Sequence, residues 1–238
     1  MLKETNDFYD KTVIPKGFEA QEPKEAPITH VKVFHKEYPR FPSIKLPEID
    51  RKDSEYESLL SLRESTRVFS DIPISLEEVS KVLGSCRIVD INRDPEKRTY
   101  PSGGARFPVE VYLAVYNVKE LEKGAYHYNM VNGTLEYILD RDLVKEKRDL
   151  ISPFLENPAA TVLFTSVIPR AEVKYGLRAY PYSLIEAGHM AQNIQLACAE
   201  IGLGACSVSG IVDEVVKEVL DLTDDEIPIY STSFGRIK

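Results

Sequence analysis

Apolar residues recur along the chain at two spacings, one typical of strands and one typical of helices. Apolar residues alternate with others over 109–116, which predicts a strand, and the apolar run at 159–167 has the length of a buried central strand. Over 183–201 apolar residues lie three and four positions apart, which predicts a long helix that ends at Gly202. Further helices are predicted at 54–62, 75–86 and 213–220, and further strands at 126–128, 135–139 and 227–234. Helices and strands interspersed in this way indicate an α+β fold.

Local signals add detail to these elements. Ser75 followed three residues later by Glu78 is a capping box, which satisfies backbone N–H groups at the start of a helix. Asn132-Gly133 lies between two predicted strands and predicts a hairpin in which both turn residues adopt positive φ. The long helix contains many small residues, so we expect a second helix to approach it closely.

The first fifty residues follow a different pattern. Prolines exclude regular elements longer than a few residues over 14–50; they are Pro15, Pro23, Pro27, Pro39, Pro42 and Pro47. We expect an extended arm that lies on the domain or on a partner subunit. The predicted organisation is a proline-rich N-terminal arm, 1–50, followed by one domain, 51–238.

Charge and composition exclude several classes of protein. The chain has 238 residues, with 30 Lys and Arg against 38 Asp and Glu, so its formal net charge is −8. An acidic chain lacks the basic surface that nucleic acid requires. No apolar run reaches the ~20 residues of a membrane helix, and the N-terminal residues lack the apolar core of a signal peptide. We therefore expect a soluble cytoplasmic protein without a nucleic-acid or membrane partner.

Several motif classes are also missing. The four histidines and three cysteines are too far apart for a metal-ligand pattern, so no metal is predicted. The Gly-x-Ser-x-Gly motif of serine hydrolases and the Walker A phosphate loop are absent. After Gly202-x-Gly204, Ser207 stands where a dinucleotide-binding fingerprint has its third glycine. These exclusions leave three segments with candidate chemistry.

Two arginines and a serine alternate in the first segment. In an extended backbone Arg63, Ser65 and Arg67 point to one side, which places two guanidinium groups and a hydroxyl in a row. Arginine suits a phosphate because its planar donors bind two oxygens at once and because it keeps its charge when partly buried. An ordinary solvated charged stretch is the alternative that spacing alone leaves open.

The other two segments are a glycine loop and a lysine-tyrosine pair. The loop at 101–106 leads into the strand at Val109, and its small residues let backbone amides approach a flat or anionic ligand; a plain tight turn is the alternative. Lys174 and Tyr175 lie between the central strand and the long helix. They are candidates for a proton-transfer pair beside a cofactor, and an ordinary surface position is the alternative.

Taken in this order, the segments resemble the FMN-dependent nitroreductase superfamily. Within it they are most similar to the SagB-type dehydrogenases, the azoline oxidases of ribosomal peptide modification. The resemblance covers roughly residues 38–238 and departs from the family pattern at Pro181, where a third basic residue is expected. The motifs are Arg63-x-Ser65-x-Arg67, Pro101-Ser102-Gly103-Gly104-Ala105-Arg106, Lys174-Tyr175-Gly176-x-Arg178-Ala179-Tyr180, Glu186-Ala187-Gly188-His189-Met190-Ala191-Gln192-Asn193 and Gly202-Leu203-Gly204.

The resemblance implies FMN as the cofactor. Arg63 and Ser65 would hold its phosphate and ribityl chain, and Arg67 would face the pyrimidine edge, where a cation stabilises the reduced flavin. Ser209-Gly210 would offer a backbone N–H to flavin N5, the atom that accepts hydride. Arg236 would be a further phosphate cation.

The resemblance also implies a nitroreductase-like fold, in which helices flank a central mixed or antiparallel sheet and two chains form an intertwined homodimer. The helix at 183–201 would form the dimer core, with its small residues packed across a two-fold axis. The glycine loop would approach the flavin from the partner subunit; its residues are Pro101, Ser102, Gly103 and Gly104.

The implied reaction is the dehydrogenation of a thiazoline or oxazoline ring in a peptide or a related small substrate. Lys174 and Tyr175 would be the base and its partner, hydride would pass to the flavin, and dioxygen would reoxidise it. Two alternatives stay open. One is an NAD(P)H-dependent nitroreductase or quinone reductase of the same fold, and the other is a flavin-binding subunit of a peptide-modifying complex.

Overall fold

The computed structural model describes residues 1–18, 35–48, 54–143 and 145–238. Its centre is a six-stranded sheet in the order β5-β4-β3-β6-β8-β7, and every neighbouring pair is antiparallel. The strands are β3 (Val109–Val115), β4 (Gly124–Asn129), β5 (Thr134–Leu139), β6 (Ala160–Val167), β7 (Leu203–Val208) and β8 (Glu226–Arg236). A separate two-stranded ribbon pairs β1 (Ile88–Asp90) with β2 (Lys97–Arg98).

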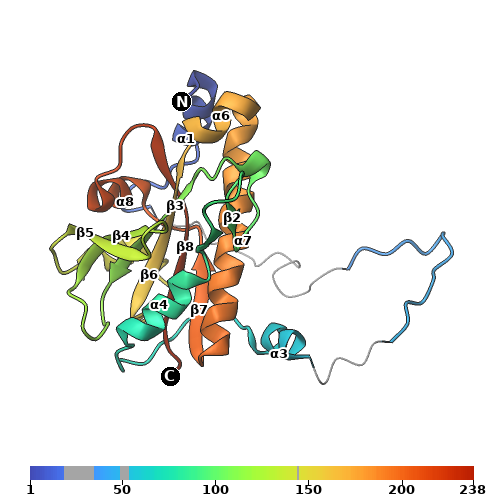
Figure 1. Ribbon diagram of the computed structural model, residues 1–238, viewed down its shortest axis with the longest axis horizontal. Coiled ribbons are helices and arrows are strands. Elements are labelled where there is room, and N and C mark those ends of the chain that lie inside the picture. The colour runs from blue at the N-terminus through green and yellow to red at the C-terminus, as the bar shows by residue number, and fades with distance from the viewer. Residues whose placement is uncertain (19–34, 49–53, 144) are drawn as a thin grey trace.

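Helices flank this sheet, with α7 running along one side of it and α8 on the other (Figure 1). The helices are α1 (Lys3–Asp10), α3 (Glu55–Leu62), α4 (Leu76–Gly84), α5 (Lys147–Leu150), α6 (Pro169–Tyr175), α7 (Ala179–Glu200) and α8 (Asp213–Leu220). Two short 3₁₀ turns are η1 (Gly103–Ala105) and η2 (Gly176–Arg178). The predicted α+β fold is confirmed.

β3 contributes to two hydrophobic cores because it lies inside the sheet and both of its faces are covered. Alternate residues of β3 pack with α4 and α7 in a cluster that includes Val111, Leu113, Val82, Met190 and Ile194. The intervening residues pack with α8 in a second cluster that includes Tyr112, Ala114, Leu150, Val215 and Val219. The strand predicted over 109–116 is therefore confirmed, and its mostly apolar character on both faces follows from its position.

The predicted helix start at Ser75 is confirmed, whereas the predicted hairpin forms with a different turn. The capping box is present, because Ser75 Oγ accepts from the Glu78 N–H at 3.2 Å and Glu78 accepts from the Ser75 N–H at 2.8 Å. The hairpin between β4 and β5 also forms. Its loop covers four residues, however, and among the two predicted turn residues Gly133 alone has a positive φ. The Asn129 side chain shapes this loop by accepting from two backbone N–H groups that follow it.

Two of the small residues of α7 face their own domain. Ala187 and Ala191 are at most 2% exposed and belong to the core between α7 and the sheet. We expected them to pack across a two-fold axis, and that interpretation is wrong for these two residues. The small side chains instead let the 22-residue helix pack closely on the sheet, mainly on β7 and β8.

The first residues of the chain pack on the domain. The Leu2 N–H and the Thr5 hydroxyl donate to Glu172 of α6, at 2.9 and 3.0 Å. The Tyr9 hydroxyl donates to Asp213 of α8 at 2.8 Å. These contacts hold α1 against two helices that are far from it in sequence. The beginning of the predicted arm is therefore a docked helix, which the proline pattern did not predict.

Residues 35–48 form no helix or strand and run outside the body of the domain (Figure 1). Their exposed large apolar side chains are Tyr38, Phe41, Ile44 and Leu46. The remainder of the predicted arm, 19–34 and 49–50, lies outside the described residues. The division of the chain at residue 50 therefore stays a prediction.

Candidate functional site

The arginine segment lies along the edge strand of the sheet. Arg63 is the C-cap of α3, and the chain then runs extended beside β7. Ser65 forms a parallel bridge with Ala205, and the Thr66 N–H donates to the Ala205 carbonyl at 3.0 Å. The sheet edge thus fixes the backbone of the segment that carries the two arginines.

Side chains of this segment alternate as the sequence predicts. Thr66 points toward the sheet, because a Cβ built at Gly204 would lie 2.6 Å from its side chain. Its neighbours Ser65 and Arg67 therefore point away from the body, and both are exposed. In the described part of the chain, neither Arg63 nor Arg67 forms an ion pair with a carboxylate. Two guanidinium groups that lack a carboxylate partner in the described ranges, in a chain of net charge −8, fit an anionic ligand.

The other predicted cofactor residues lie at the ends of the neighbouring strands. Ser209 and Gly210 follow β7 directly, and both are exposed. Arg236 is the last residue of β8, and its guanidinium forms an ion pair with Glu78 at 2.6 Å. Unlike the two arginines of the segment, Arg236 already has a partner, so its contact with a phosphate stays a prediction. We call the arginine segment together with Ser209 and Gly210 the β7 half-site.

The second and third candidate segments meet in one place. Lys174 and Tyr175 end α6, and Lys174 Nζ lies 5.3 Å from the centre of the Tyr175 ring. A Cβ built at Gly104 would lie 2.8 Å from Lys174 Nζ and would overlap the Tyr175 hydroxyl. Because Lys174 and Tyr175 lie at the end of a helix, their adjacent side chains can both reach Gly104. We call the 101–104 loop with Lys174 and Tyr175 the α6 half-site.

The loop of the α6 half-site is conformationally strained. Gly104, Ala105 and Phe107 have φ angles of 59°, 54° and 46°. This left-handed backbone costs a non-glycine residue roughly 1–2 kcal/mol. The Ser102 hydroxyl holds the loop, because it accepts from the Phe107 N–H at 2.9 Å and donates to Glu186 of α7. Strain that the surrounding structure enforces is typical of functional sites.

Glu186 is a candidate functional residue, although its sequence motif indicates no role for it. It is 2% exposed, one carboxylate oxygen accepts from Ser102, and the other has no hydrogen-bond partner in the described part of the chain. Burial raises the pKa of Glu186 to about 7, although the hydrogen bond from Ser102 and the charges of Arg98 and Arg170 oppose this rise. One feature of the sequence could have indicated Glu186. It is an acidic residue next to Ala187, at a position of the helix where the other residues that face the sheet are small or apolar.

Replacing Gly104 by alanine is expected to lower the free energy of unfolding by roughly 1–2 kcal/mol, because the left-handed backbone there disfavours a side chain. The added methyl group also displaces the Tyr175 hydroxyl. Gly103→Ala is the matched control, since its Cβ would meet Tyr182 at 3.6 Å, an ordinary contact. Urea unfolding of both variants measures the difference. Equal stability of the two would contradict the close packing described here.

The two half-sites are separate within one chain. Among the described residues, no hydrogen bond, ion pair or ring contact joins Lys174 or Tyr175 to the arginine segment or to Ser209. The loop instead contacts α7 through Ser102 and Gly103. The described contacts therefore join the loop to Lys174 and Tyr175, whereas the arginine segment lies beside β7, and Ser209 and Gly210 follow that strand.

Other site types find little support in the described ranges. No cluster of three or more His, Cys, Asp or Glu side chains there has the arrangement of a metal site. The three cysteines are buried free thiols. None of the described helices combines the length and the hydropathy that a membrane span requires.

Comparison with known proteins identifies relatives over most of the chain. The profile of the Nitroreductase family matches residues 60–236. The protein MJ1384 of Methanocaldococcus jannaschii, a nitroreductase by name, is 31% identical over 195 residues, which cover 81% of this chain and 96% of that protein. The microcin B17-processing protein McbC of Escherichia coli is 30% identical over 149 residues, which cover 59% of this chain and 55% of McbC.

The fold is also found in a solved complex. A chain of the E. coli microcin synthetase McbBCD complex with truncated pro-MccB17 superimposes with a TM-score of 0.81, over 100% of this chain and 95% of that chain, at 24% identity. The family and the fold that the motifs predict are therefore confirmed. The chain belongs to the Nitroreductase family and is an oxidoreductase.

Proposed function

We propose that this protein is an FMN-dependent dehydrogenase of the SagB type, which oxidises thiazoline or oxazoline rings in a peptide or a related small substrate. The observation that carries the proposal is the meeting of Lys174 and Tyr175 at Gly104, which places a base and a hydroxyl beside a backbone of minimal bulk. The similarity to McbC, a peptide-processing protein, supports this class of substrate.

The β7 half-site would hold the cofactor. Arg63 and Arg67 have no internal ion-pair partner in the described ranges, and Ser65 is exposed beside them, which suits a phosphate and a hydroxylated chain. Ser209 and Gly210 would lie at the flavin ring. When bound, FMN supplies the acceptor for the hydride that leaves the substrate.

The α6 half-site would move the proton. Oxidation of an azoline ring to an azole removes one proton and one hydride, so the ring loses two electrons and two hydrogen atoms in total. We propose that Lys174 Nζ accepts the proton from the ring carbon and that the Tyr175 hydroxyl holds the lysine or the ring nitrogen in place. Lysine acts as a base in its neutral form, which desolvation favours. Because Lys174 is exposed in the single chain, the substrate or a second chain would have to cover it.

A homodimer would join the two half-sites. One chain carries them apart, so a second copy would place the α6 half-site of one subunit over the β7 half-site of the other. Helix α7 offers an exposed face for this contact, with residues three and four positions apart; they are Ile185, Gly188, His189 and Gln192.

Arg63→Ala is expected to weaken FMN binding by about tenfold or more, because a charge-assisted contact contributes ~1.5–3 kcal/mol. Arg93→Ala is the control, since this exposed arginine lies outside both half-sites. Titration of flavin-free protein with FMN, followed by flavin fluorescence, measures the two affinities. A wild-type protein that binds no FMN, or an Arg63 variant that binds it unchanged, contradicts the proposed cofactor site.

The reaction itself is tested with a short peptide that contains one thiazoline. The FMN-loaded protein in air should convert it to a thiazole, which mass spectrometry detects as the loss of two hydrogen atoms. NADPH should not be needed. Rapid bleaching of the flavin by NADPH under nitrogen, with no change in the peptide, would indicate a nicotinamide-dependent reductase instead.

A further inference from the structure

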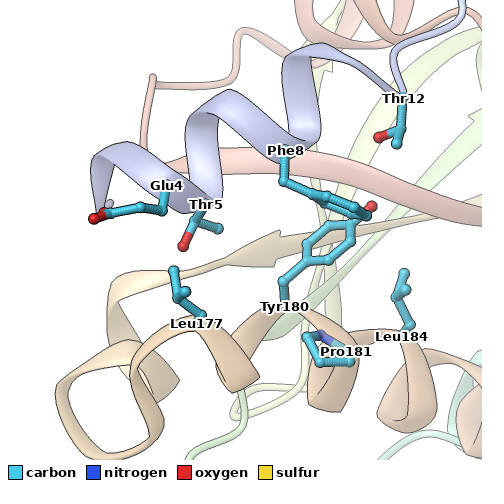
Figure 2. A pocket seen from close by; sticks show the side chains of 8 residues that line it. All are labelled: Glu4, Thr5, Phe8, Thr12, Leu177, Tyr180, Pro181 and Leu184. Carbon is cyan, nitrogen blue, oxygen red and sulfur yellow. The ribbon is translucent and has the colours of Figure 1, made fainter.

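A hollow opens between α1 and the beginning of α7 (Figure 2). Its volume is about 620 Å³, within the range of small-molecule sites in proteins. Figure 2 shows α1 along one side and the turn and first residues of α7 along the other. The residues that line it are Glu4, Thr5, Phe8, Thr12, Leu177, Tyr180, Pro181 and Leu184.

The lining is apolar and partly open to solvent. Phe8 and Leu177 are 56% and 53% exposed, although neighbouring apolar side chains of the domain are buried. The rings of Phe8 and Tyr180 meet edge to face, with 5.7 Å between their centres. Glu4 is the one lining residue with a charged side chain. A hollow of this kind favours an uncharged aliphatic or aromatic group and disfavours an anion.

Polar contacts hold α1, which forms one wall of the hollow, in place on the domain. The N-terminal ammonium donates to Asp225 at 2.9 Å, and the Leu2 N–H and Thr5 hydroxyl donate to Glu172. At the other end of the helix, the Tyr9 hydroxyl donates to Asp213. These bonds hold α1 in place, with Thr5 and Phe8 both facing the hollow. Because α1 is already held in place before a ligand binds, less conformational entropy is lost on binding.

A second hollow connects this region with the β7 half-site. It has a volume of about 300 Å³ and adjoins the first one, since Thr12, Tyr180 and Leu184 line both. Ser209 also lines the second hollow. From Ser209 to the outer end at Leu177, the surface is therefore a series of two adjoining hollows along α7. Leu177 and Leu184 are seven positions apart, which corresponds to ~10 Å along a helix.

We propose that the hollow between α1 and α7 binds an uncharged apolar group of the substrate, such as an aromatic or branched aliphatic side chain next to the reacting ring. The ring itself would lie at Ser209. This inference rests on the proposed function for the position of the ring, whereas the apolar binding site stands on the lining of the hollow alone. The adjoining hollow at Ser209 is what favours a substrate group over other occupants.

The first experiment measures the site without turnover. N-Phenyl-1-naphthylamine, a neutral aromatic dye, should bind the FMN-loaded protein saturably with increased fluorescence. Leu177→Arg should weaken this binding by about tenfold or more, since it places a charge in the apolar lining. Val131→Arg is the matched control, because Val131 is 65% exposed and lies outside the hollow. Equal binding of the dye by both variants would overturn the proposal.

The second experiment connects the site with the substrate. Two thiazolines that carry a phenyl group or a carboxylate at the same position compete with the dye. The phenyl compound should displace it at much lower concentration, and Leu177→Arg should raise KM for that compound with kcat retained. Displacement without any oxidation would leave the apolar site supported and the proposed function contradicted. Equal displacement by both compounds would overturn the site.

Sedimentation velocity separates the remaining occupant, a second copy of this chain. The proposal requires that Leu177→Arg and the wild-type protein have the same oligomeric state. If this substitution instead dissociates the protein and the dye binds the dissociated chain as well as before, the hollow belongs to a subunit interface and the proposal is wrong.

Discussion

Lys174→Ala should lower the turnover of a thiazoline peptide by ~10²–10⁴-fold, the usual contribution of a positioned general base. Tyr175→Phe should cause a loss of the same order, because the hydroxyl that reaches Gly104 is removed. Both variants should keep wild-type FMN content, since neither side chain contacts the arginine segment in the described part of the chain. Mass spectrometry of the peptide and flavin absorbance provide the two readouts.

Lys147→Ala is the control for this prediction. Lys147 lies over the Tyr116 ring at 5.2 Å, much as Lys174 lies over Tyr175 at 5.3 Å, but it belongs to α5. Lys147→Ala therefore also removes a cation that lies over a tyrosine ring, but it leaves the α6 half-site intact. Combining the Lys174 and Tyr175 changes should cost less than the product of the single losses if the two act together. Full turnover by Lys174→Ala would remove this lysine from the reaction.

Glu186→Gln should change how the stability of the protein depends on pH. Burial raises the pKa of Glu186 from its ordinary value of 4.5 to about 7, so the folded state binds a proton more tightly than the unfolded state. The stabilisation from that proton is fully present below about pH 4.5 and is lost as the pH rises through about 7. A shift of this size corresponds to on the order of 3 kcal/mol.

Glutamine keeps an oxygen for the Ser102 hydroxyl but cannot ionise. Compared with the wild type, Glu186→Gln should therefore gain stability on going from acidic to mildly alkaline buffer, as measured by urea unfolding at several pH values. Glu77→Gln is the control, because Glu77 is exposed on α4. A constant difference between Glu186→Gln and the wild type at every pH would show that Glu186 does not titrate in this range.

The elements that the sequence predicted well have strong local patterns. The β3 alternation, the capping box at Ser75 and the stop at Gly202 each depend on residues within one element or its ends. The long helix predicted from residue 183 begins four residues earlier, at Ala179, so that Pro181 lies inside its first turn. Proline is tolerated in a first helical turn, where its missing N–H has no partner, so α7 begins at Ala179.

Several elements were not predicted, and two of them, β7 and α1, form through long-range contacts. The residues of β7 are mostly small and have low strand propensity, and Gly204 is required there by the close approach of Thr66. The α1 sequence is short and polar, and its place depends on Glu172 and Asp213, more than 160 residues away. No local periodicity reports contacts of this kind.

The candidate site shows the same division. The residues that suit a phosphate and a proton transfer could be identified in the sequence, because each set lies within a few neighbouring positions. The contact between Gly104 and the Lys174-Tyr175 pair was not visible, because it joins segments 70 residues apart. Glu186 was also not assigned a role, since its importance arises from burial beside Ser102, which no sequence spacing shows.

The arginine segment also protects the sheet. β7 is an edge strand, and the bridge from Ser65 and the hydrogen bond from Thr66 engage its outer side. An edge strand with free N–H and C=O groups pairs readily with strands of other molecules, which is a common start of aggregation. If the segment that is proposed to hold the FMN phosphate detaches, that edge becomes available to neighbouring chains. If the proposed cofactor site is right, cofactor retention and resistance to aggregation depend on the same few residues.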